Sequence, residues 1–271
     1  MTILVTGGTG LVGARLLKRL VAAGMDCRAL VRSGKQPAEG AAAITGDLLA
    51  PTSLTPAVEG VSAIVHLAAV LRTPDPNDIW RANVEGTKNL IAAARQHSPG
   101  VRFIMASTGL VYDADGPRPA REGDAVSPKM AYPASKIAAE RELRDSGLKW
   151  SILRLGFVYG DEDGHLQSIP HLAERFKWHP ANKLSMIHHR DIHTAVELAL
   201  TGALDGRIVN IVDEAPMSMY ELAGLVGAPM APSSEPLTNP WFGQLDGAVA
   251  RSLGFRPVVA TTCQAHREGA L

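Results

Sequence analysis

Cysteine, net charge and long apolar runs are all scarce in this chain of 271 residues, and each scarcity excludes a class of protein. The two cysteines, Cys27 and Cys263, stand far apart, so the sequence predicts neither a disulfide framework nor a cysteine-based metal site. Lysine plus arginine equals aspartate plus glutamate, 27 each, which leaves no net positive charge to attract nucleic acid or an anionic membrane. No apolar run approaches the roughly 20 residues of a membrane-spanning helix. Strand-forming residues begin at Thr2 and leave no room for a signal peptide, so we expect a cytoplasmic protein.

The first thirteen residues contain the motif around which the rest of the chain is organised. Residues 3–6 are apolar and β-branched, and residues 14–23 have the pattern of an amphipathic helix. Between them stand Gly7, Gly10 and Gly13, which allow a sharp turn, a close approach of backbone N–H groups to a pyrophosphate, and tight packing of helix on strand. The helix N-terminus adds its dipole and free donors. A purely structural turn is the alternative, but the flanking strand and helix favour dinucleotide binding.

Six further apolar runs alternate with helical segments along the chain. The runs cover residues 27–31, 42–46, 62–67, 101–106, 150–155 and 208–212, and the longest helical segments are 79–96 and 132–144. Such alternation predicts a parallel sheet with right-handed crossovers and a ligand at the carboxyl ends of the strands. We therefore predict an α/β fold, a Rossmann-like doubly wound parallel sheet with a small C-terminal substrate-binding part.

The less regular segments set the predicted domain boundaries. Residues 1–156 form the dinucleotide-binding domain, to which 186–213 return, while 157–185 and 214–258 form the substrate-binding part and 259–271 a C-terminal tail. The length of the chain suits one large α/β domain with such an appendage.

The end of the second predicted strand favours NADP over NAD as the cofactor. An acidic residue there would bind the ribose 2′-hydroxyl of NAD, but the residue is Arg32, whose guanidinium suits a 2′-phosphate. An arginine in a loop is otherwise a solvated charge, so NAD remains the second choice. Asp47, after the third strand, can accept a hydrogen bond from the adenine amino group, although aspartate is also common in plain turns.

The strongest catalytic pattern joins Tyr132, Lys136 and Thr108. Tyr132 and Lys136 are four apart on a predicted helix and share one face. A phenol is a poor base at its ordinary pKa near 10, and a nearby ammonium lowers that pKa, so the pair can pass a proton at neutral pH. Thr108 ends the preceding strand and could hydrogen-bond the reacting oxygen. A chance pair on a helix surface is the alternative, but its place after a dinucleotide-binding half favours catalysis.

Several further stretches carry a resemblance to one family. They are residues 6–13, 46–48, 66–69, 83–87, 107–112, 132–136, 154–160, 189–192, 210–213 and 250–255. With these stretches in family order, the chain resembles the extended short-chain dehydrogenase/reductases, the group often called the NAD-dependent epimerase/dehydratase family. The order, which spans residue 2 to about residue 257, is more specific than any single motif.

The resemblance implies a role for each matching position. Thr108 occupies the catalytic Ser/Thr position, Tyr132 would be the acid/base, Lys136 would lower its pKa and hold the nicotinamide ribose, and Asn83 would complete the set. Leu155, Gly156 and Val158 would lie near the nicotinamide. Together the residues predicted to bind the cofactor are Gly7, Thr9, Gly10, Leu11, Val12, Gly13, Arg32, Asp47, Leu48, Leu67, Ala68, Ala69, Ala106, Ser107, Tyr132, Lys136, Leu155, Gly156 and Val158.

Departures from the family pattern bear on the reaction. Sugar dehydratases of this kind have an acidic pair after the catalytic threonine, where this chain has Gly109 and Leu110, so we do not expect sugar dehydration. Phe157 stands where many nucleotide-sugar enzymes have asparagine. We therefore expect an NAD(P)-dependent oxidoreductase that transfers hydride between the nicotinamide and a carbonyl or alcohol of a small molecule. A nucleotide-sugar epimerase with tightly bound NAD is one alternative. A non-catalytic cofactor-sensing protein is another, against which the presence of Tyr132 and Lys136 argues.

A group of histidines raises the question of a metal. His189 and His193 have the spacing of two ligands on one helix face, with His188 and Asp191 beside them. The alternative, which we favour, is that Asp191 caps a helix starting at Ile192 and that the histidines bond nearby carbonyls, so no metal is predicted. Ser218 and Glu221 have the spacing of a capping box and predict a second helix start.

The helices predicted over 79–96 and 132–144 carry many small side chains, among them Ala92, Ala93, Ala94, Ala138 and Ala139. In the family that the chain resembles, these two helices form a dimer interface, so a homodimer is expected. Packing of the same side chains against the sheet alone is the alternative.

Overall fold

The computed structural model describes residues 1–112 and 116–271 of the chain. Residues 113–129 are rich in proline, glycine and charge, which predicts an exposed loop, and this segment lies partly outside the described residues. In the described part, seven strands form one sheet in the order β10-β6-β5-β4-β1-β2-β3, and every neighbouring pair is parallel. The strands are β1 (Thr2–Thr6), β2 (Asp26–Val31), β3 (Ala42–Thr45), β4 (Ala63–His66), β5 (Arg102–Thr108), β6 (Lys149–Leu155) and β10 (Arg207–Ile211). The predicted α/β fold with a doubly wound parallel sheet is confirmed.

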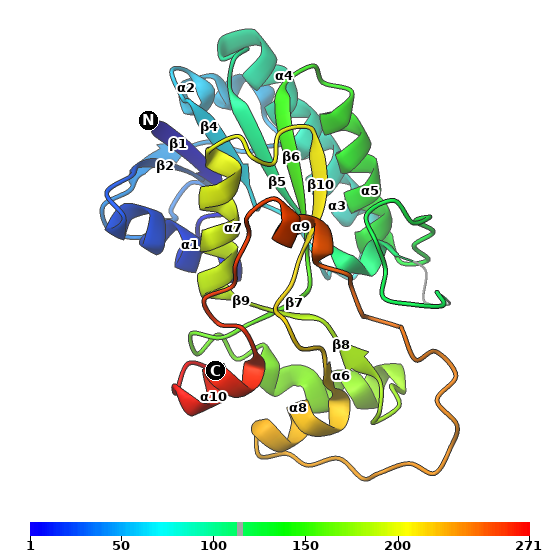
Figure 1. The fold of residues 1–271 in the computed structure, drawn as a ribbon. Helices are drawn as coiled ribbons and strands as arrows, with labels where there is room; N and C mark the ends of the chain where they lie inside the picture. Colours follow the sequence, from blue (N-terminus) through cyan, green and yellow to red (C-terminus); the bar gives the residue numbers. More distant parts are fainter. Residues whose placement is uncertain (113–115) are drawn as a thin grey trace.

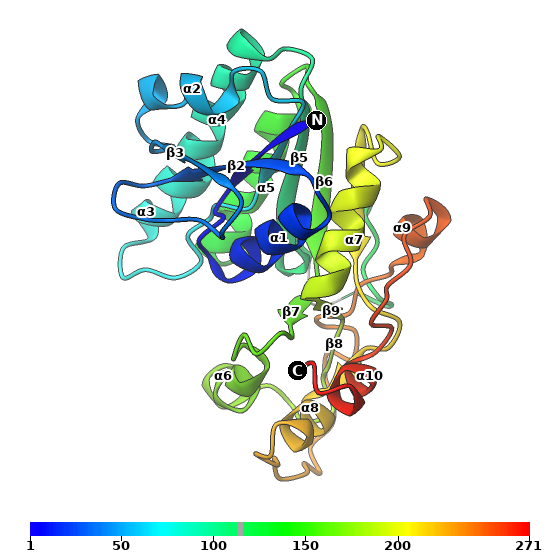
Figure 2. The ribbon, with the colours of Figure 1, turned by 90° about the vertical axis from the view of Figure 1, so that its left-hand side faces the viewer.

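Helices cover both faces of this sheet, as Figure 2 shows. One face carries α1 (Leu11–Ala22) and α7 (His189–Leu200), and the other carries α2 (Thr55–Val58), α4 (Gly86–His97) and α5 (Ala131–Arg144). The strands supply both cores by alternation: in β1, Ile3 and Val5 join the apolar cluster under α1 and α7, while Leu4 joins the opposite cluster. Among the described residues, none of the helices is long and apolar enough to cross a lipid bilayer.

The single helix predicted over 79–96 is wrong in detail. Asp75 caps α3 (Pro76–Trp80) by accepting the backbone N–H of Asn77 at 2.9 Å, so the helical stretch begins earlier. A π-helical turn, Arg81–Glu85, then separates α3 from α4. The hydroxyl of Thr87, at the start of α4, donates to the backbone oxygen of Asn83 in this turn at 2.7 Å. Such widened turns occur mostly at functional sites, and hydrophobic periodicity does not reveal them.

A smaller part of the chain lies below the sheet in Figure 1. It contains β7 (Phe157–Tyr159), paired with β9 (Met186–His188), and β8 (Lys183–Leu184), paired with β11 (Met217–Ser218). Its helices α6 (Ile169–Phe176), α8 (Met219–Leu225) and α10 (Thr262–Arg267) contribute to a third apolar cluster. By contrast α9 (Ala248–Ser252) packs on the sheet side, where Ala250 joins the core beside α7. The domain boundaries predicted above stay predictions.

Two predicted helix starts have different outcomes. Ser218 caps α8, and the capping box with Glu221 is complete, as predicted. The prediction that Asp191 caps a helix at Ile192 is wrong, because α7 begins at His189 and the side chain of His188 accepts the N–H of Arg190 at 3.1 Å. The buried carboxylate of Asp191 instead accepts the backbone N–H groups of Val258 and Val259.

Candidate active site

A cavity of about 1400 Å³ lies at the carboxyl ends of the parallel strands, where such folds bind ligands. Every residue predicted to bind the cofactor lines this cavity, and so do Thr108, Tyr132 and Lys136. Asn83 is the one predicted site residue that does not line it. The structure therefore brings together motifs that lie up to 150 residues apart in the sequence.

The glycine turn has no room for side chains. Gly7 has a φ of +74°, and a Cβ placed on it would lie 2.6 Å from the backbone nitrogen of Ala68. A Cβ on Gly13 would lie 2.0 Å from the carbonyl oxygen of Gly7. Gly10 precedes α1, and no side chain caps this helix, so its first N–H groups remain available to a phosphate in the cavity. This arrangement fits the pyrophosphate of a dinucleotide.

Two cations line the end of the cavity near β2. Arg32 follows β2, and Lys35 follows three residues later, where its N–H donates to the carbonyl oxygen of Arg32 at 3.0 Å. Sequence analysis missed Lys35, although its spacing from Arg32 was visible. Asp47 also lines the cavity, and its Oδ1 accepts the N–H of Leu49 at 2.8 Å in a local turn. The turn interpretation of Asp47 thus describes its contacts, while its bond to adenine stays a prediction.

A buried polar layer lies behind the cavity. His66 hydrogen-bonds Thr6 at 2.7 Å and Thr87 at 2.9 Å, and burial lowers the pKa of His66 to about 3, so the ring is neutral. Lys136 is only 2% exposed, and burial lowers its pKa to about 8 against the opposing effect of Glu140. This ammonium therefore lies beside the cavity in surroundings where its charge is weakly screened.

Glu140 and Arg154 form a buried ion pair beside this layer. Nη2 and Nε of Arg154 lie 2.7 and 3.1 Å from the two oxygens of Glu140. Ser107, which also lines the cavity, donates to Oε1 of Glu140 at 2.5 Å. Sequence analysis missed Glu140, whose only signal was its place one helical turn after Lys136. The pair fixes α5, which carries Tyr132 and Lys136, against the ends of β5 and β6.

Burial keeps Tyr132 protonated at neutral pH. It raises the pKa of Tyr132 to about 12, because the phenolate would lose its contact with water. The expectation that Lys136 lowers the pKa of Tyr132 stays a prediction, because burial is the cause of the raised value, and no hydrogen bond within the described residues reaches the phenol. Oγ1 of Thr108 accepts the N–H of Leu110 at 3.2 Å, and its own proton has no acceptor among the described residues. Both hydroxyls can therefore donate to an oxygen in the cavity.

Asn83 does not line the cavity but holds together two segments beside it. Its amide accepts from the N–H of Val70 at 2.8 Å and donates to the carbonyl of Val70 at 3.0 Å and to Oγ of Ser135 at 2.9 Å. Ser135 in turn donates to the carbonyl oxygen of Tyr132 at 2.7 Å. Asn83 thus joins the loop after β4 to the first turn of α5, which positions Tyr132. Its predicted catalytic role stays a prediction.

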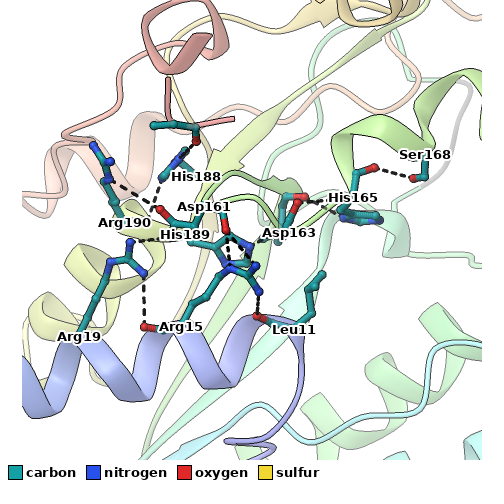
Figure 3. Close-up of polar contacts among 12 residues, drawn as sticks. Leu11, Arg15, Arg19, Asp161, Asp163, His165, Ser168, His188, His189 and Arg190 are labelled. Atoms are coloured by element: carbon teal, nitrogen blue, oxygen red, sulfur yellow. Dashed lines mark hydrogen bonds and ion pairs between the residues drawn. The ribbon is translucent and has the colours of Figure 1, made fainter. Parts of the chain in front are cut away.

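His188 and His189 belong to a polar network between α1 and the smaller part (Figure 3). His189 lies 2.7 Å from Oδ2 of Asp163, and both side chains are 1% exposed. His193 pairs with Glu197 at 3.4 Å. Within the described residues no group of three or more His, Cys, Asp or Glu side chains could hold a metal ion.

Asp161 is the centre of the same network. Its backbone oxygen accepts from Nε and Nη2 of Arg15 at 3.2 and 2.9 Å, and its carboxylate pairs with Arg19 at 2.6 Å (Figure 3). Two helical turns of α1 are thus fastened to the segment after β7. In that segment His165 bonds the carbonyl of Val158 at 2.8 Å and stacks on Phe157 at 4.2 Å, and all three side chains line the cavity.

The parallel sheet, the glycine turn and the uncapped helix define a Rossmann-type dinucleotide-binding protein. The model of the NAD dependent epimerase/dehydratase family matches residues 3–211, and the chain belongs to this family, within the extended short-chain dehydrogenase/reductases. The resemblance inferred from the motifs is thereby confirmed.

Individual relatives carry names of oxidoreductases. A Stigmatella aurantiaca protein, named as a ketoreductase of 4-hydroxy-2-methyl-3-oxo-4-farnesyl-3,4-dihydroquinoline-1-oxide, is 32% identical over 83% of this chain and 72% of its own length. A Stenotrophomonas maltophilia 2-alkyl-3-oxoalkanoate reductase is 34% identical over 65% of this chain and 56% of its own length, so the chain spans just over half of that relative. The crystal structure of a short-chain dehydrogenase/reductase superfamily protein from Agrobacterium tumefaciens with bound NAD matches with a TM-score of 0.82 and 25% identity, over 99% of this chain and 95% of the other. The family is NAD-dependent and includes both reductases and epimerases.

Proposed function

We propose that this protein is an oxidoreductase that transfers hydride between a nicotinamide cofactor and a carbonyl or alcohol of a small molecule. The observation that carries the proposal is the lining of a single cavity by the glycine turn, Thr108, Tyr132 and Lys136. A cofactor site and three groups able to handle an oxygen and its proton thus face the same space. The names of two relatives as reductases support the same direction of chemistry.

The side chains divide the work at the substrate oxygen. A bound nicotinamide supplies the hydride that carbonyl reduction requires. Thr108 donates a hydrogen bond to the carbonyl oxygen, since its proton is not engaged elsewhere in the described chain. Tyr132 gives its proton to the same oxygen, because its raised pKa of about 12 keeps it protonated at neutral pH. Lys136, one helical turn further on, places positive charge beside the phenolate that remains.

The test is the substitution Tyr132→Phe, which removes the transferred proton and keeps the ring. We expect kcat to fall by roughly 10²- to 10⁴-fold, the usual contribution of general acid catalysis. The readout is oxidation of NADPH with the best ketone from a panel, and cofactor affinity is measured beside it. Tyr220→Phe is the matched control, since Tyr220 is half exposed on α8 and outside the cavity. Unchanged turnover in the Tyr132 variant would remove the proposed mechanism.

For the cofactor we propose NADP in preference to NAD, with Arg32 and Lys35 on the 2′-phosphate. Two flexible cations at this end of the cavity favour a ligand with an extra anionic group. Titration of NADPH and NADH against the protein, Arg32→Ala and Lys35→Ala tests the choice. We expect each variant to lose affinity for NADPH about tenfold and to bind NADH as before. Equal losses for the two cofactors would assign these residues to general binding.

A nucleotide-sugar epimerase remains the second candidate within the family. Such an enzyme oxidises and re-reduces one carbon, so it would be purified with NAD bound and would need none added. Phe157 lines the cavity and offers no hydrogen bond to a sugar or phosphate, which favours the oxidoreductase. Measuring the absorbance of released cofactor after denaturation separates the two.

We also propose that the protein is a cytoplasmic homodimer with α4 and α5 at the interface. Ala92 on α4 is exposed and Ala138 on α5 is partly so, while Ala93, Ala94 and Ala139 pack inward against the sheet. The two cysteines are unpaired, which suits a reducing compartment. Sedimentation equilibrium tests the assembly, and a mass equal to one chain would exclude the dimer.

A further inference from the structure

Large apolar side chains that reach solvent line the cavity in the predicted cofactor segments, at Leu11 and Leu49, and also outside these segments. Leu71, Leu110, Met130, Phe176 and Trp241 line the cavity there and are 42, 43, 52, 43 and 38% exposed. We call these five residues the apolar rim. Leu110 and Met130 stand two positions from Thr108 and Tyr132 respectively, so the rim begins beside the proposed catalytic groups. Exposed apolar groups gathered in one concave place mark a binding surface rather than ordinary scatter.

Aromatic rings extend the rim inward. The ring of Trp178 lies 5.5 Å from that of Phe176 and 6.0 Å from that of Phe242, and all three residues line the cavity. Leu172 and Leu184, both buried, add aliphatic wall beside them. Segments from α6, β8 and residues 241–245 thus contribute apolar side chains to the cavity that Thr108 and Tyr132 also line.

Charges near this surface are mostly engaged or solvated. Arg118 is held by Asp124 through two contacts of 2.8 Å, and Arg154 lies behind the cavity wall on Glu140. Arg72 and Lys129 line the cavity and are exposed, and the guanidinium of Arg175, which is exposed too, lies 5.5 Å from the ring centre of Phe176. Arginine holds a phosphate most strongly in a bidentate geometry, whereas a hydrocarbon needs only apolar wall.

We infer that the substrate is a carbonyl compound with a large hydrocarbon body, an alkyl chain or apolar ring system that covers the apolar rim while its carbonyl faces Thr108 and Tyr132. The inference rests on the proposed hydride transfer at this site. A cavity of about 1400 Å³ exceeds the usual 300–1000 Å³ of a single-ligand pocket and suits a dinucleotide together with such a body. Each methylene that leaves water for the rim strengthens binding by roughly fourfold at most.

The experiment measures kcat/KM for NADPH-dependent reduction along a series of methyl ketones from 2-pentanone to 2-undecanone. We expect a rise of at least tenfold across the series, because added methylenes cover more of the rim. Trp241→Ala and Phe176→Ala should flatten the rise. Their matched controls, Trp80→Ala and Tyr220→Ala, remove similarly exposed aromatic rings outside the cavity and should preserve it. A kcat/KM that does not depend on chain length, or equal behaviour of rim and control variants, would overturn the inference.

A binding measurement separates this inference from the proposed reaction. Calorimetric titration of 2-pentanone and 2-undecanone into the NADP⁺-saturated Tyr132→Phe protein requires no hydride transfer. Tighter binding of the longer ketone supports an apolar substrate site even if no ketone is ever reduced. Binding of UDP-glucose with no binding of either ketone would overturn the inference and leave the cofactor site and hydride chemistry intact.

Discussion

The two halves of the cavity are built in opposite ways. The cofactor half is formed by backbone that approaches so closely that a single Cβ at Gly7 or Gly13 would collide with it. The substrate half is formed by large side chains with spare room, such as Phe176 and Trp241. One half is fixed by sterics and by buried ion pairs, while the other is bounded by exposed segments that belong to different parts of the chain.

The difference indicates where substitutions will be tolerated. Around the glycine turn and the polar layer behind it, nearly every group has a partner, so a change leaves a clash or a buried charge. At the apolar rim a change alters what the ligand touches and leaves the fold intact. The scaffold can therefore keep one cofactor while its substrates vary.

The largest expected effect comes from the buried ion pair. Glu140→Gln keeps the size of the side chain but leaves the charge of Arg154 uncompensated, which costs about 3–5 kcal/mol of unfolding free energy. Urea denaturation measures it. Glu142→Gln is the control, because its pair with Lys88 is largely solvated and contributes less than about 1 kcal/mol. Similar losses of unfolding free energy in the two variants would mean that the buried pair contributes no more to stability than the solvated pair.

Next in size is Gly13→Ala, set against Gly224→Ala. At Gly13 the new Cβ meets the oxygen of Gly7, so we expect a loss of about 1–3 kcal/mol of stability and at least a tenfold weaker NADPH affinity. Gly224 lies exposed on α8 with nothing within 4 Å, and alanine there should add about 0.5–1 kcal/mol. Thermal denaturation and NADPH titration give both results. If alanine at Gly13 were neutral, the contrast between the halves would fail.

Asn83→Ala tests the link between the loop after β4 and the first turn of α5. The loss of its bonds leaves the N–H and carbonyl of Val70 unpaired and costs about 2 kcal/mol. Because Ser135 and the first turn of α5 lose their anchor, kcat should fall more than KM rises. Asn77→Ala, on an exposed position of α3, is the control. A change in KM alone would argue against a role in placing Tyr132.

The last expected effect, the smallest when taken per pH unit, is a dependence of stability on pH at the junction of the two parts. Burial raises the pKa of Asp213 to about 8, and Oδ2 has no partner within the described chain. The folded protein thus keeps a proton that the unfolded chain releases above about pH 4, so stability falls as pH rises from about 4 to 8. Asp213→Asn should remove up to about 1.4 kcal/mol of this fall per pH unit. Parallel denaturation profiles at pH 5, 6 and 7 would contradict the assignment.

Sequence patterns predicted the sheet and the tight glycine turn well, because both depend on local rules. Strand alternation and the spacing of Gly7, Gly10 and Gly13 reflect conformations that neighbouring residues impose. The partners of Glu140 and Arg154 and the π-helical turn at Asn83 depend on which segments meet in space, so local patterns missed them. The raised pKa of Tyr132 escaped for the same reason, since burial has no local signature.

The contacts of Asp161 with α1 limit which segments can be exchanged between this protein and its relatives. Residues 157–165 lie in the smaller part by sequence, yet Arg15 and Arg19 fasten them to α1. A chimera that replaces the chain from residue 160 onward would cut these contacts and free the helix that faces the pyrophosphate. A graft that begins after Ser168 would carry Phe176 and Trp178 across intact. The segment that must be exchanged to change the substrate is therefore shorter than the smaller part that contains it.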